Sequence, residues 1–174
     1  CAYHDKWEWV KDCYPAIAAY LQPFEAAAQK RGDKGDFWWE LRACDYYDRF
    51  EYPKIIFPDI APRPNFTLDE IGGFFDANTC YNLIYSDKFL LGLLNSQLIN
   101  FYYRYLAAVY RGGYLRFFSQ YVEMLPIRTI DPANPAEVAR HDRIVALVEQ
   151  MLDLNRRLAA AKAPHEKEVL AGMI

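Results

Sequence analysis

The stretch Pro53-Lys54-Ile55-Ile56-Phe57-Pro58 carries the clearest strand signal of the chain. Its β-branched and aromatic residues favour an extended backbone, and a proline bounds it at each end. Because proline has no N–H group for a neighbouring strand, we expect this strand to be short or to lie on a sheet edge. Residues 79–85 have the same strand character, so the sequence predicts a small sheet.

Helices are expected before and after these strands. Residues 15–32 begin with a proline and end with a glycine, the usual arrangement at the two ends of a helix. A longer helix should occupy residues 86–113, with Ser86 or Asp87 as its N-terminal cap. Residues 114–127 are aromatic and extended. Together these elements predict an α+β domain with a small mixed sheet packed by helices.

A different element follows the proline-bearing linker at residues 131–135. Five apolar residues then alternate at spacings of three and four, as in the seam of a coiled coil: Ile144, Leu147, Met151, Leu154 and Leu158. Two heptads are too few to be stable alone, so this helix needs a partner in this chain or elsewhere. We therefore expect a globular domain over residues 1–130 and a linker with a coiled-coil-type helical arm over residues 131–174.

The charge distribution limits how the chain can bind an anionic partner. The 174 residues carry a formal net charge of −3, which excludes nucleic-acid binding through bulk positive charge. Residues 88–122, however, contain no Asp or Glu and include Lys88, Arg104, Arg111 and Arg116. Aromatic residues make up 17% of the chain, which fits either a well-packed core or a core that meets a binding surface.

The cysteines and the apolar segments give no sign of secretion or membrane insertion. The four cysteines are widely spaced and lack paired histidines, which argues against a zinc site and a disulfide framework and favours reduced thiols in the cytoplasm. The most apolar segment, residues 89–110, contains polar side chains and an arginine that are costly in lipid. We expect a buried helix there and no membrane partner.

Motifs for common DNA-modifying chemistry are missing. None of the eight lysines has an acidic residue two places before it, so the usual restriction-nuclease metal motif is absent. No Asn-Pro-Pro-aromatic tetrad for a flipped adenine occurs, and no glycine-rich strand-to-helix turn for a nucleotide cofactor. We therefore expect no catalytic centre, no metal site and no cofactor in this chain.

Residues 38–127 resemble a known family in several ordered blocks. The blocks are WELR at 39–42, PKIIFPDI at 53–60, NTCY at 78–81, LLGLLNS at 90–96, RGGYLRF at 111–117, QY at 120–121 and LPI at 125–127. They are similar to the TaqI-like C-terminal specificity domain of adenine-specific DNA methyltransferases and of type IIG restriction-modification enzymes. One such block alone would be weak, but their order along half of the chain is specific.

The resemblance implies a function and several partners. In that family the specificity domain reads the target bases of double-stranded DNA, and a separate N-terminal domain binds S-adenosylmethionine and methylates the adenine. The chain would then be a recognition domain that positions a target adenine for a methyltransferase domain of the same polypeptide, which can also include an endonuclease. A coiled-coil-like helix after the recognition domain is implied as well.

The first candidate DNA-binding segment is the loop containing Arg111, Gly112, Gly113, Tyr114 and Arg116. Two glycines let the backbone approach a phosphate, and arginines can bind phosphate or donate in a fork to guanine. The tyrosine can stack or donate to the DNA backbone. The alternative is that the glycines only end the long helix and the arginines are solvated.

Further candidates lie outside that loop. Arg63 and Asn65 occupy a proline-bounded loop and suit guanine and adenine, respectively, in the major groove, although they also fit a plain polar surface loop. Lys54 and Arg49 are candidate phosphate contacts, and Gln120 is a candidate reader of a base edge.

Two other functions remain open from the sequence. The chain can be a protein-interaction module that dimerises through the arm at residues 131–174, with no role for DNA. It can also be an enzyme with an unfamiliar centre that uses Asp59 or Asp76.

Overall fold

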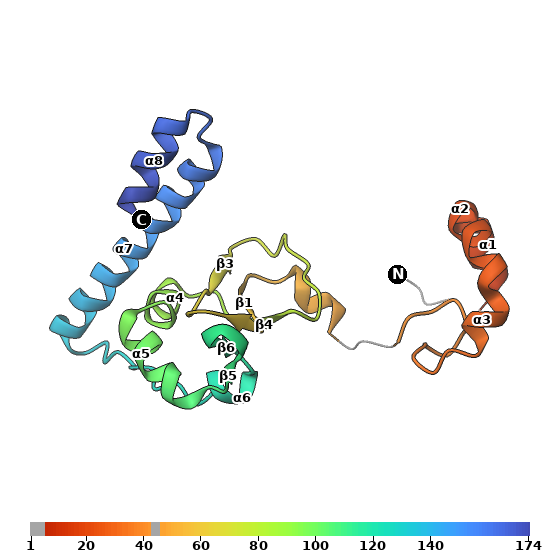
Figure 1. Ribbon diagram of the computed structural model, residues 1–174, viewed down its shortest axis with the longest axis horizontal. Helices are drawn as coiled ribbons and strands as arrows, with labels where there is room; N and C mark the ends of the chain where they lie inside the picture. Colours follow the sequence, from red (N-terminus) through yellow and green to blue (C-terminus); the bar gives the residue numbers. More distant parts are fainter. Residues whose placement is uncertain (1–5, 43–45) are drawn as a thin grey trace. The chain divides into compact units, whose positions relative to one another are not determined.

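The computed structural model describes residues 6–42 and 46–174, except for the side chain of Arg111. The chain forms two compact units, Cys1–Tyr47 and Asp48–Ile174, called here the N-terminal and C-terminal units. Figure 1 shows the course of the chain through both. Mixed helices and small sheets confirm the expected α+β class.

The N-terminal unit is built from short helices around an aromatic cluster. Its helical elements are α1 (Trp7–Cys13), α2 (Pro15–Leu21), the 3₁₀ turn η1 (Gln22–Phe24) and α3 (Glu25–Gln29). The helix predicted to begin at Pro15 is confirmed, with a 3₁₀ break where Pro23 occurs. The ring of Trp7 lies 4.6 Å from that of Trp38 and 5.3 Å from that of Trp39. Packing of these rings holds the helices and the following loop together.

The C-terminal unit contains two three-stranded sheets, both antiparallel. The first has the order β3-β1-β4 and the second the order β2-β6-β5. Their strands are β1 (Lys54–Pro58), β2 (Ile60–Ala61), β3 (Thr67–Asp69), β4 (Cys80–Leu83), β5 (Val109–Tyr110) and β6 (Tyr114–Arg116). The pairing is thus antiparallel where a mixed sheet was expected. The close neighbours β5 and β6 are joined by a hairpin turn, which only antiparallel strands allow. The predicted strand β1 is indeed short, but it lies in the middle of its sheet.

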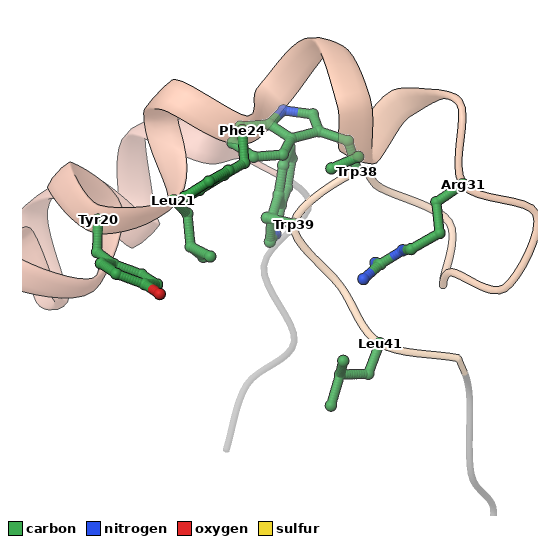
Figure 2. Close-up of a pocket in the computed structure, with 8 residues that line it drawn as sticks. Tyr20, Leu21, Phe24, Arg31, Trp38, Trp39 and Leu41 are labelled. Carbon is green, nitrogen blue, oxygen red and sulfur yellow. The ribbon is translucent and has the colours of Figure 1, made fainter.

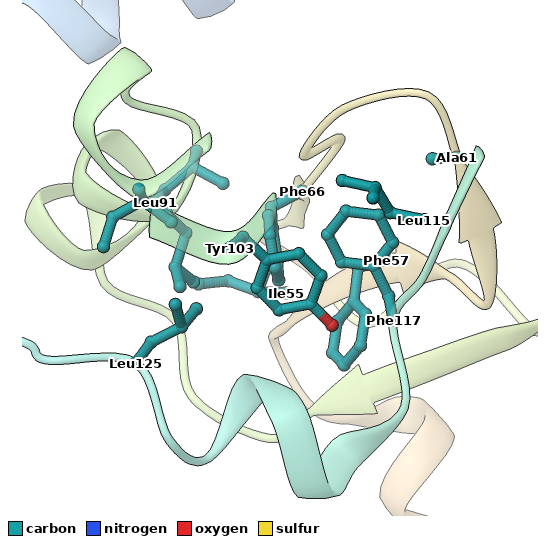
Figure 3. Packing of buried hydrophobic residues seen from close by; sticks show 11 residues of the cluster. Ile55, Phe57, Ala61, Phe66, Leu91, Tyr103, Leu115, Phe117 and Leu125 are labelled. Carbon is teal, nitrogen blue, oxygen red and sulfur yellow. The ribbon is translucent and has the colours of Figure 1, made fainter. Parts of the chain in front are cut away.

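Aliphatic and aromatic residues from several elements form the core of this unit (Figure 3). The rings of Tyr103 and Phe117 stack with centroids 4.5 Å apart and planes 5° from parallel. The hydroxyl of Tyr103 donates to the backbone carbonyl of Arg116 at 2.9 Å, so this buried polar group is satisfied. Burial raises the pKa of Tyr103 above its ordinary value, which keeps the hydroxyl a donor at all ordinary pH. The hydrogen bond therefore joins helix α5 (Gln97–Leu106), which contains Tyr103, to strand β6.

Residues 86–113 form two helices and a strand rather than one helix. Helix α4 (Lys88–Leu94) is capped by Asp87, whose carboxylate accepts from the N–H of Leu90 at 2.6 Å. Helix α5 (Gln97–Leu106) is capped by Ser96, whose hydroxyl accepts from the N–H of Ile99 at 3.2 Å. The single long helix was wrong because Asn95 and Ser96 offer the backbone side-chain partners that end one helix and start another.

Residues 114–127 are only partly extended. Strand β6 ends at Arg116, and helix α6 (Ser119–Val122) follows after two residues. A long strand there would lack paired neighbours, since β2 and β5 are two residues long each.

The C-terminal segment forms a helical hairpin that packs on the rest of the unit. Helix α7 (Pro135–Ala160) contacts α4 and α8 (Pro164–Met173). A Cβ atom at Gly92 of α4 would lie 2.8 Å from Val148 and 3.0 Å from Ile144, so α4 and α7 approach closely there. Leu147 and Met151, from the middle of the predicted seam, are exposed instead. A coiled coil and a functional boundary near residue 131 both stay predictions.

Within the described residues, no helix is both long enough and apolar enough to cross a membrane.

Candidate nucleic-acid interface

The second sheet brings together two predicted DNA-binding segments that lie about 50 residues apart in the chain. Strand β2 pairs antiparallel with β6, with Ile60 opposite Arg116 and Ala61 opposite Leu115. The chain that leaves β2 therefore continues past the start of β6 toward Gly113. The loop with Arg63 and the turn before β6 therefore extend from the same end of the sheet, which we call the reading end.

The turn at the reading end joins two strands. Residues Arg111–Gly113 (η3) connect β5 to β6, which pair with Tyr110 opposite Tyr114. Gly112 and Gly113 have φ values of 77° and 82°, in the left-handed region that glycine alone adopts at little cost. The alternative that these glycines end the long helix is therefore wrong. The Arg111 side chain lies outside the described part of the structure.

One face of this sheet is open to solvent. Tyr110 and Tyr114 are about half exposed and lie opposite one another, whereas Leu115, on the other face, is buried in the core. Paired tyrosines on an exposed face supply flat rings and hydroxyl donors. Such a face can contact sugars, bases or phosphates.

The loop between β2 and β3 is fixed by two buried side chains and by hydrogen bonds from Asn95, and it exposes its polar residues. Pro64 and Phe66 are buried, and they alternate with the exposed Arg63 and Asn65. The side-chain amide of Asn95 binds both backbone groups of Phe66, accepting from its N–H at 3.0 Å and donating to its carbonyl at 2.9 Å. Among the described residues, Arg63 and Asn65 make no side-chain hydrogen bond or ion pair. The loop thus presents them to solvent from a fixed base.

Arg104 contacts the loop at the reading end, although the predicted set of site residues did not include it. It is exposed on α5, and its Nη2 lies 3.5 Å from the carbonyl oxygen of Pro62 in the same loop. The acid-free segment 88–122 contains it, so charge patterning was the signal that pointed to it.

Arg116 has a more enclosed position than the sequence suggested. Its Nη2 lies 3.1 Å from Oδ2 of Asp59, and a quarter of its side chain is exposed. Its guanidinium lies over the ring of Phe118, 4.2 Å from the centroid. Asp59, considered above as a catalytic residue, is therefore the partner of an arginine.

Lys54 is not at the surface, so it is unavailable for a phosphate in this structure. Its ammonium is fully buried in the first sheet and donates to Oδ2 of Asp69 at 2.7 Å and to the carbonyl of Phe50 at 2.6 Å. Its charge predicted a phosphate contact. The residue that neutralises it, Asp69, is 15 residues away in the chain, so no local sequence pattern indicates the pair. Lys54 stabilises the fold instead.

Arg49 and Gln120 are exposed and belong to neither segment of the reading end. Arg49 is in the 3₁₀ turn η2 (Tyr47–Glu51), which precedes the first sheet. Gln120 lies in α6, beyond the opposite end of β6 from the glycine turn. The strand register thus places Arg63, Asn65 and the turn at one end of the sheet and Gln120 beyond the other.

A shallow pocket in the N-terminal unit contains none of the predicted site residues (Figure 2). Its volume is about 330 Å³, and Arg31 on its rim donates to the backbone carbonyl of Glu40. The lining residues are Tyr20, Leu21, Phe24, Ala28, Arg31, Trp38, Trp39 and Leu41. The N-terminal unit therefore has its own aromatic hollow.

Two features of metal and nucleotide sites are absent among the described residues. No three His, Cys, Asp or Glu side chains in the part of the chain that the structure describes are grouped to hold a metal. The turn at Gly112 joins two strands, and Gly72 follows β3 into a loop, so neither glycine pair forms the strand-to-helix turn of a nucleotide site.

The segment that contains these residues matches a known protein family. The TaqI-like C-terminal specificity domain family matches residues 18–127, which include every predicted site residue. The chain belongs to the TaqI-like C-terminal specificity domain family. The match to this family ends at the same residue as the resemblance in the sequence and begins 20 residues earlier.

A curated relative of this specificity domain is the type II methyltransferase M.BanIII from Aneurinibacillus aneurinilyticus. The two sequences are 28% identical over 154 residues, which is 82% of this chain. The matched part is only 25% of the relative, so the chain spans about a quarter of the length of that methyltransferase.

Proposed function

We propose that this specificity domain recognises a DNA sequence for a type II restriction-modification methyltransferase, of the IIG-like kind. It would position a target adenine for N6-methylation by an N-terminal methyltransferase domain of the same polypeptide. S-adenosylmethionine would bind to that other domain, since the residues described here do not fit it. Endonuclease activity in the same protein stays a prediction.

The meeting of two exposed polar segments at the reading end carries this proposal. Arg63 and Asn65 have donors and acceptors suited to base edges and phosphates, and the adjoining glycine turn lets DNA approach the backbone. The stretch that forms α4, α5, β5 and β6 has no acidic residue to repel phosphates. Family membership supports the same conclusion.

Binding of the chain to a library of random duplexes tests this function. We expect a preferred sequence and an affinity that falls steeply with salt, because phosphate contacts release counterions. Arg63→Ala and Arg111→Ala should weaken binding. Arg143→Ala is the matched control, since it removes the same charge from an exposed position on α7. No salt-sensitive affinity for any duplex at low ionic strength would contradict the proposal.

A second candidate is protein association through the helical hairpin. Leu147 on α7 and Val169 on α8 are half exposed, and Met151 and Met173 are exposed as well. Apolar residues on adjacent helices can bind another helix. Sedimentation of the chain at several concentrations tests this, and a monomer without change at high concentration would exclude dimerisation through the hairpin.

A further inference from the structure

Arg116 is held in one orientation by three neighbours. The Oδ2 of Asp59 lies 3.1 Å from its Nη2, the ring of Phe118 lies 4.2 Å from its guanidinium carbon and the ring of Tyr110 lies 5.8 Å away. An ion pair fixes one edge of the guanidinium, and an aromatic face fixes its plane. Arg116 therefore differs from Arg63, whose side chain has no protein partner among the described residues.

The backbone around Asp59 fixes the carboxylate in turn. Its N–H donates to the carbonyl of Thr79 at 2.8 Å, and its carbonyl accepts from the N–H of Phe117 at 2.7 Å. Asp59 lies between β1 and β2, so these two bonds tie it to both sheets. The orientation of Arg116 is thus set by the fold and does not require DNA.

An ion-paired arginine suits a base better than a phosphate. The carboxylate of Asp59 neutralises most of the charge that would attract a phosphate, whereas the N–H donors keep their directions. Phosphate contacts depend on net charge, and base contacts depend on the geometry of donors and acceptors. Resting on the function proposed above, we propose that Arg116 reads the edge of a guanine base and that Asp59 is its positioning residue.

The atoms that remain free fit guanine in particular. Nε of Arg116 and Oδ1 of Asp59 are buried without a hydrogen-bond partner among the described residues, and one N–H of Nη2 faces Asp59. The donors left for a ligand are those of Nη1 and the second N–H of Nη2. Guanine presents two acceptors, O6 and N7, to such a fork, whereas adenine replaces O6 with an amino donor. Arg63, with its unpaired charge, would contact a phosphate.

A change on the DNA side tests the proposal without altering the protein. Once a preferred duplex is selected, each guanine is replaced in turn by 7-deazaguanine, which lacks N7. At one position, the wild-type chain should lose about tenfold in affinity, and Arg116→Lys should lose less, because an ammonium keeps the charge but lacks the planar fork that donates to O6 and N7 together. The proposal is overturned when no guanine is sensitive, or when Arg116→Lys shows the same sensitivity as the wild type.

Salt dependence separates a base reader from a phosphate contact. Arg116→Lys should reduce the preference for guanine over adenine at that position and leave the slope of log affinity against log salt unchanged. Asp59→Asn should also reduce the preference, and it can steepen the slope because it frees the charge of Arg116. Arg63→Ala should lower that slope by about 1 and keep the preference. Thermal unfolding followed by circular dichroism checks that each variant is folded.

The outcomes distinguish this proposal from the function on which it rests. A wild-type chain without any sequence preference would contradict both. A wild-type preference that Arg116→Lys and Asp59→Asn keep, with a lower salt slope for Arg116→Ala, would make Arg116 a phosphate contact and leave the recognition function intact.

Discussion

Lys54 and Asp69 form a buried ion pair, with 2.7 Å between Nζ and Oδ2. Asp69 also accepts hydrogen bonds from the N–H groups of Gly73 and Phe74, at 3.1 Å and 3.0 Å. The pair thus joins strand β1 to strand β3 and to the loop that follows it. Every lone pair and proton of such a buried pair needs a partner, because desolvation of an unpaired charge is costly.

Removing the lysine should therefore destabilise the C-terminal unit strongly. We expect Lys54→Met to lower the free energy of unfolding by about 3 to 5 kcal/mol, since it leaves the carboxylate of Asp69 buried and unpaired. Urea unfolding followed by circular dichroism measures this, because the four tryptophans all lie in the N-terminal unit. Lys162→Met is the control at an exposed position, and equal stability of the two variants would contradict the prediction.

The same pair predicts a pH dependence of stability. Burial tends to raise the pKa of Asp69, but hydrogen bonds from Lys54, Phe74 and Gly73 outweigh it and lower the pKa from 3.8 to about 2. The folded state thus binds the proton less tightly than the unfolded state. Stabilisation by Asp69 is complete above pH 4 and is lost as pH falls toward 2. In a urea titration series, Asp69→Asn should lack this contribution to the acid limb, and an identical acid limb would refute it.

The bonds between Asn95 and Phe66 should control the loop that carries Arg63. Asn95→Ala leaves the N–H and carbonyl of Phe66 without these partners, which costs about 1 to 3 kcal/mol. Hydrogen exchange at the amide of Phe66 should accelerate, and affinity for the preferred duplex should fall. Asn155→Ala is the control, because Asn155 donates only to the carbonyl of Met151 within α7 and should change neither measurement.

A substitution at Gly113 tests the cost of the left-handed backbone conformation without any steric clash. An added Cβ would meet no atom within 4 Å, so Gly113→Ala is disfavoured only by its φ of 82°. We expect a loss of about 1 kcal/mol and weaker DNA binding as the hairpin changes shape. Gly172→Ala, in the last turn of α8, should be neutral or slightly stabilising because that glycine has no positive φ. Equal effects of the two substitutions would contradict this account.

Gly92 should set the distance between α4 and α7. A methyl group there would approach Val148 within 2.8 Å, so Gly92→Ala should cost about 1 to 3 kcal/mol through overpacking. The double variant Gly92→Ala with Val148→Ala restores the space. Its stability should exceed the sum expected from the two single variants, and strict additivity in a double-mutant cycle would rule out this contact as the cause.

Local patterns in the sequence predicted the elements whose signals are contiguous. The strand around Ile55, the helix that starts at Pro15 and the cap at Asp87 all depend on neighbours in the chain. Each of these was confirmed. The break at Asn95 was missed because the apolar pattern continues through it. The one local signal for the new helix is Ser96, whose side chain caps its first turn.

Pairings between distant residues could not be predicted. Nothing near Lys54 in the chain shows that Asp69 neutralises it, and nothing near Arg63 shows that the glycine turn is its neighbour. Both depend on strand register, which is set by the packing of the whole sheet. The candidate residues at the reading end were therefore named correctly as polar loop residues, but their grouping came from the structure.

The way the loop at Arg63 is anchored has a consequence for how such domains diversify. Asn95 binds Phe66 through main-chain atoms, and the buried side chains of Pro64 and Phe66 alternate with the exposed ones. The scaffold therefore does not depend on which side chains stand at positions 63 and 65. Under the function proposed above, a single codon change at position 65 would alter the recognised bases while the fold stays as it is, and one at position 63 would alter only the strength of binding.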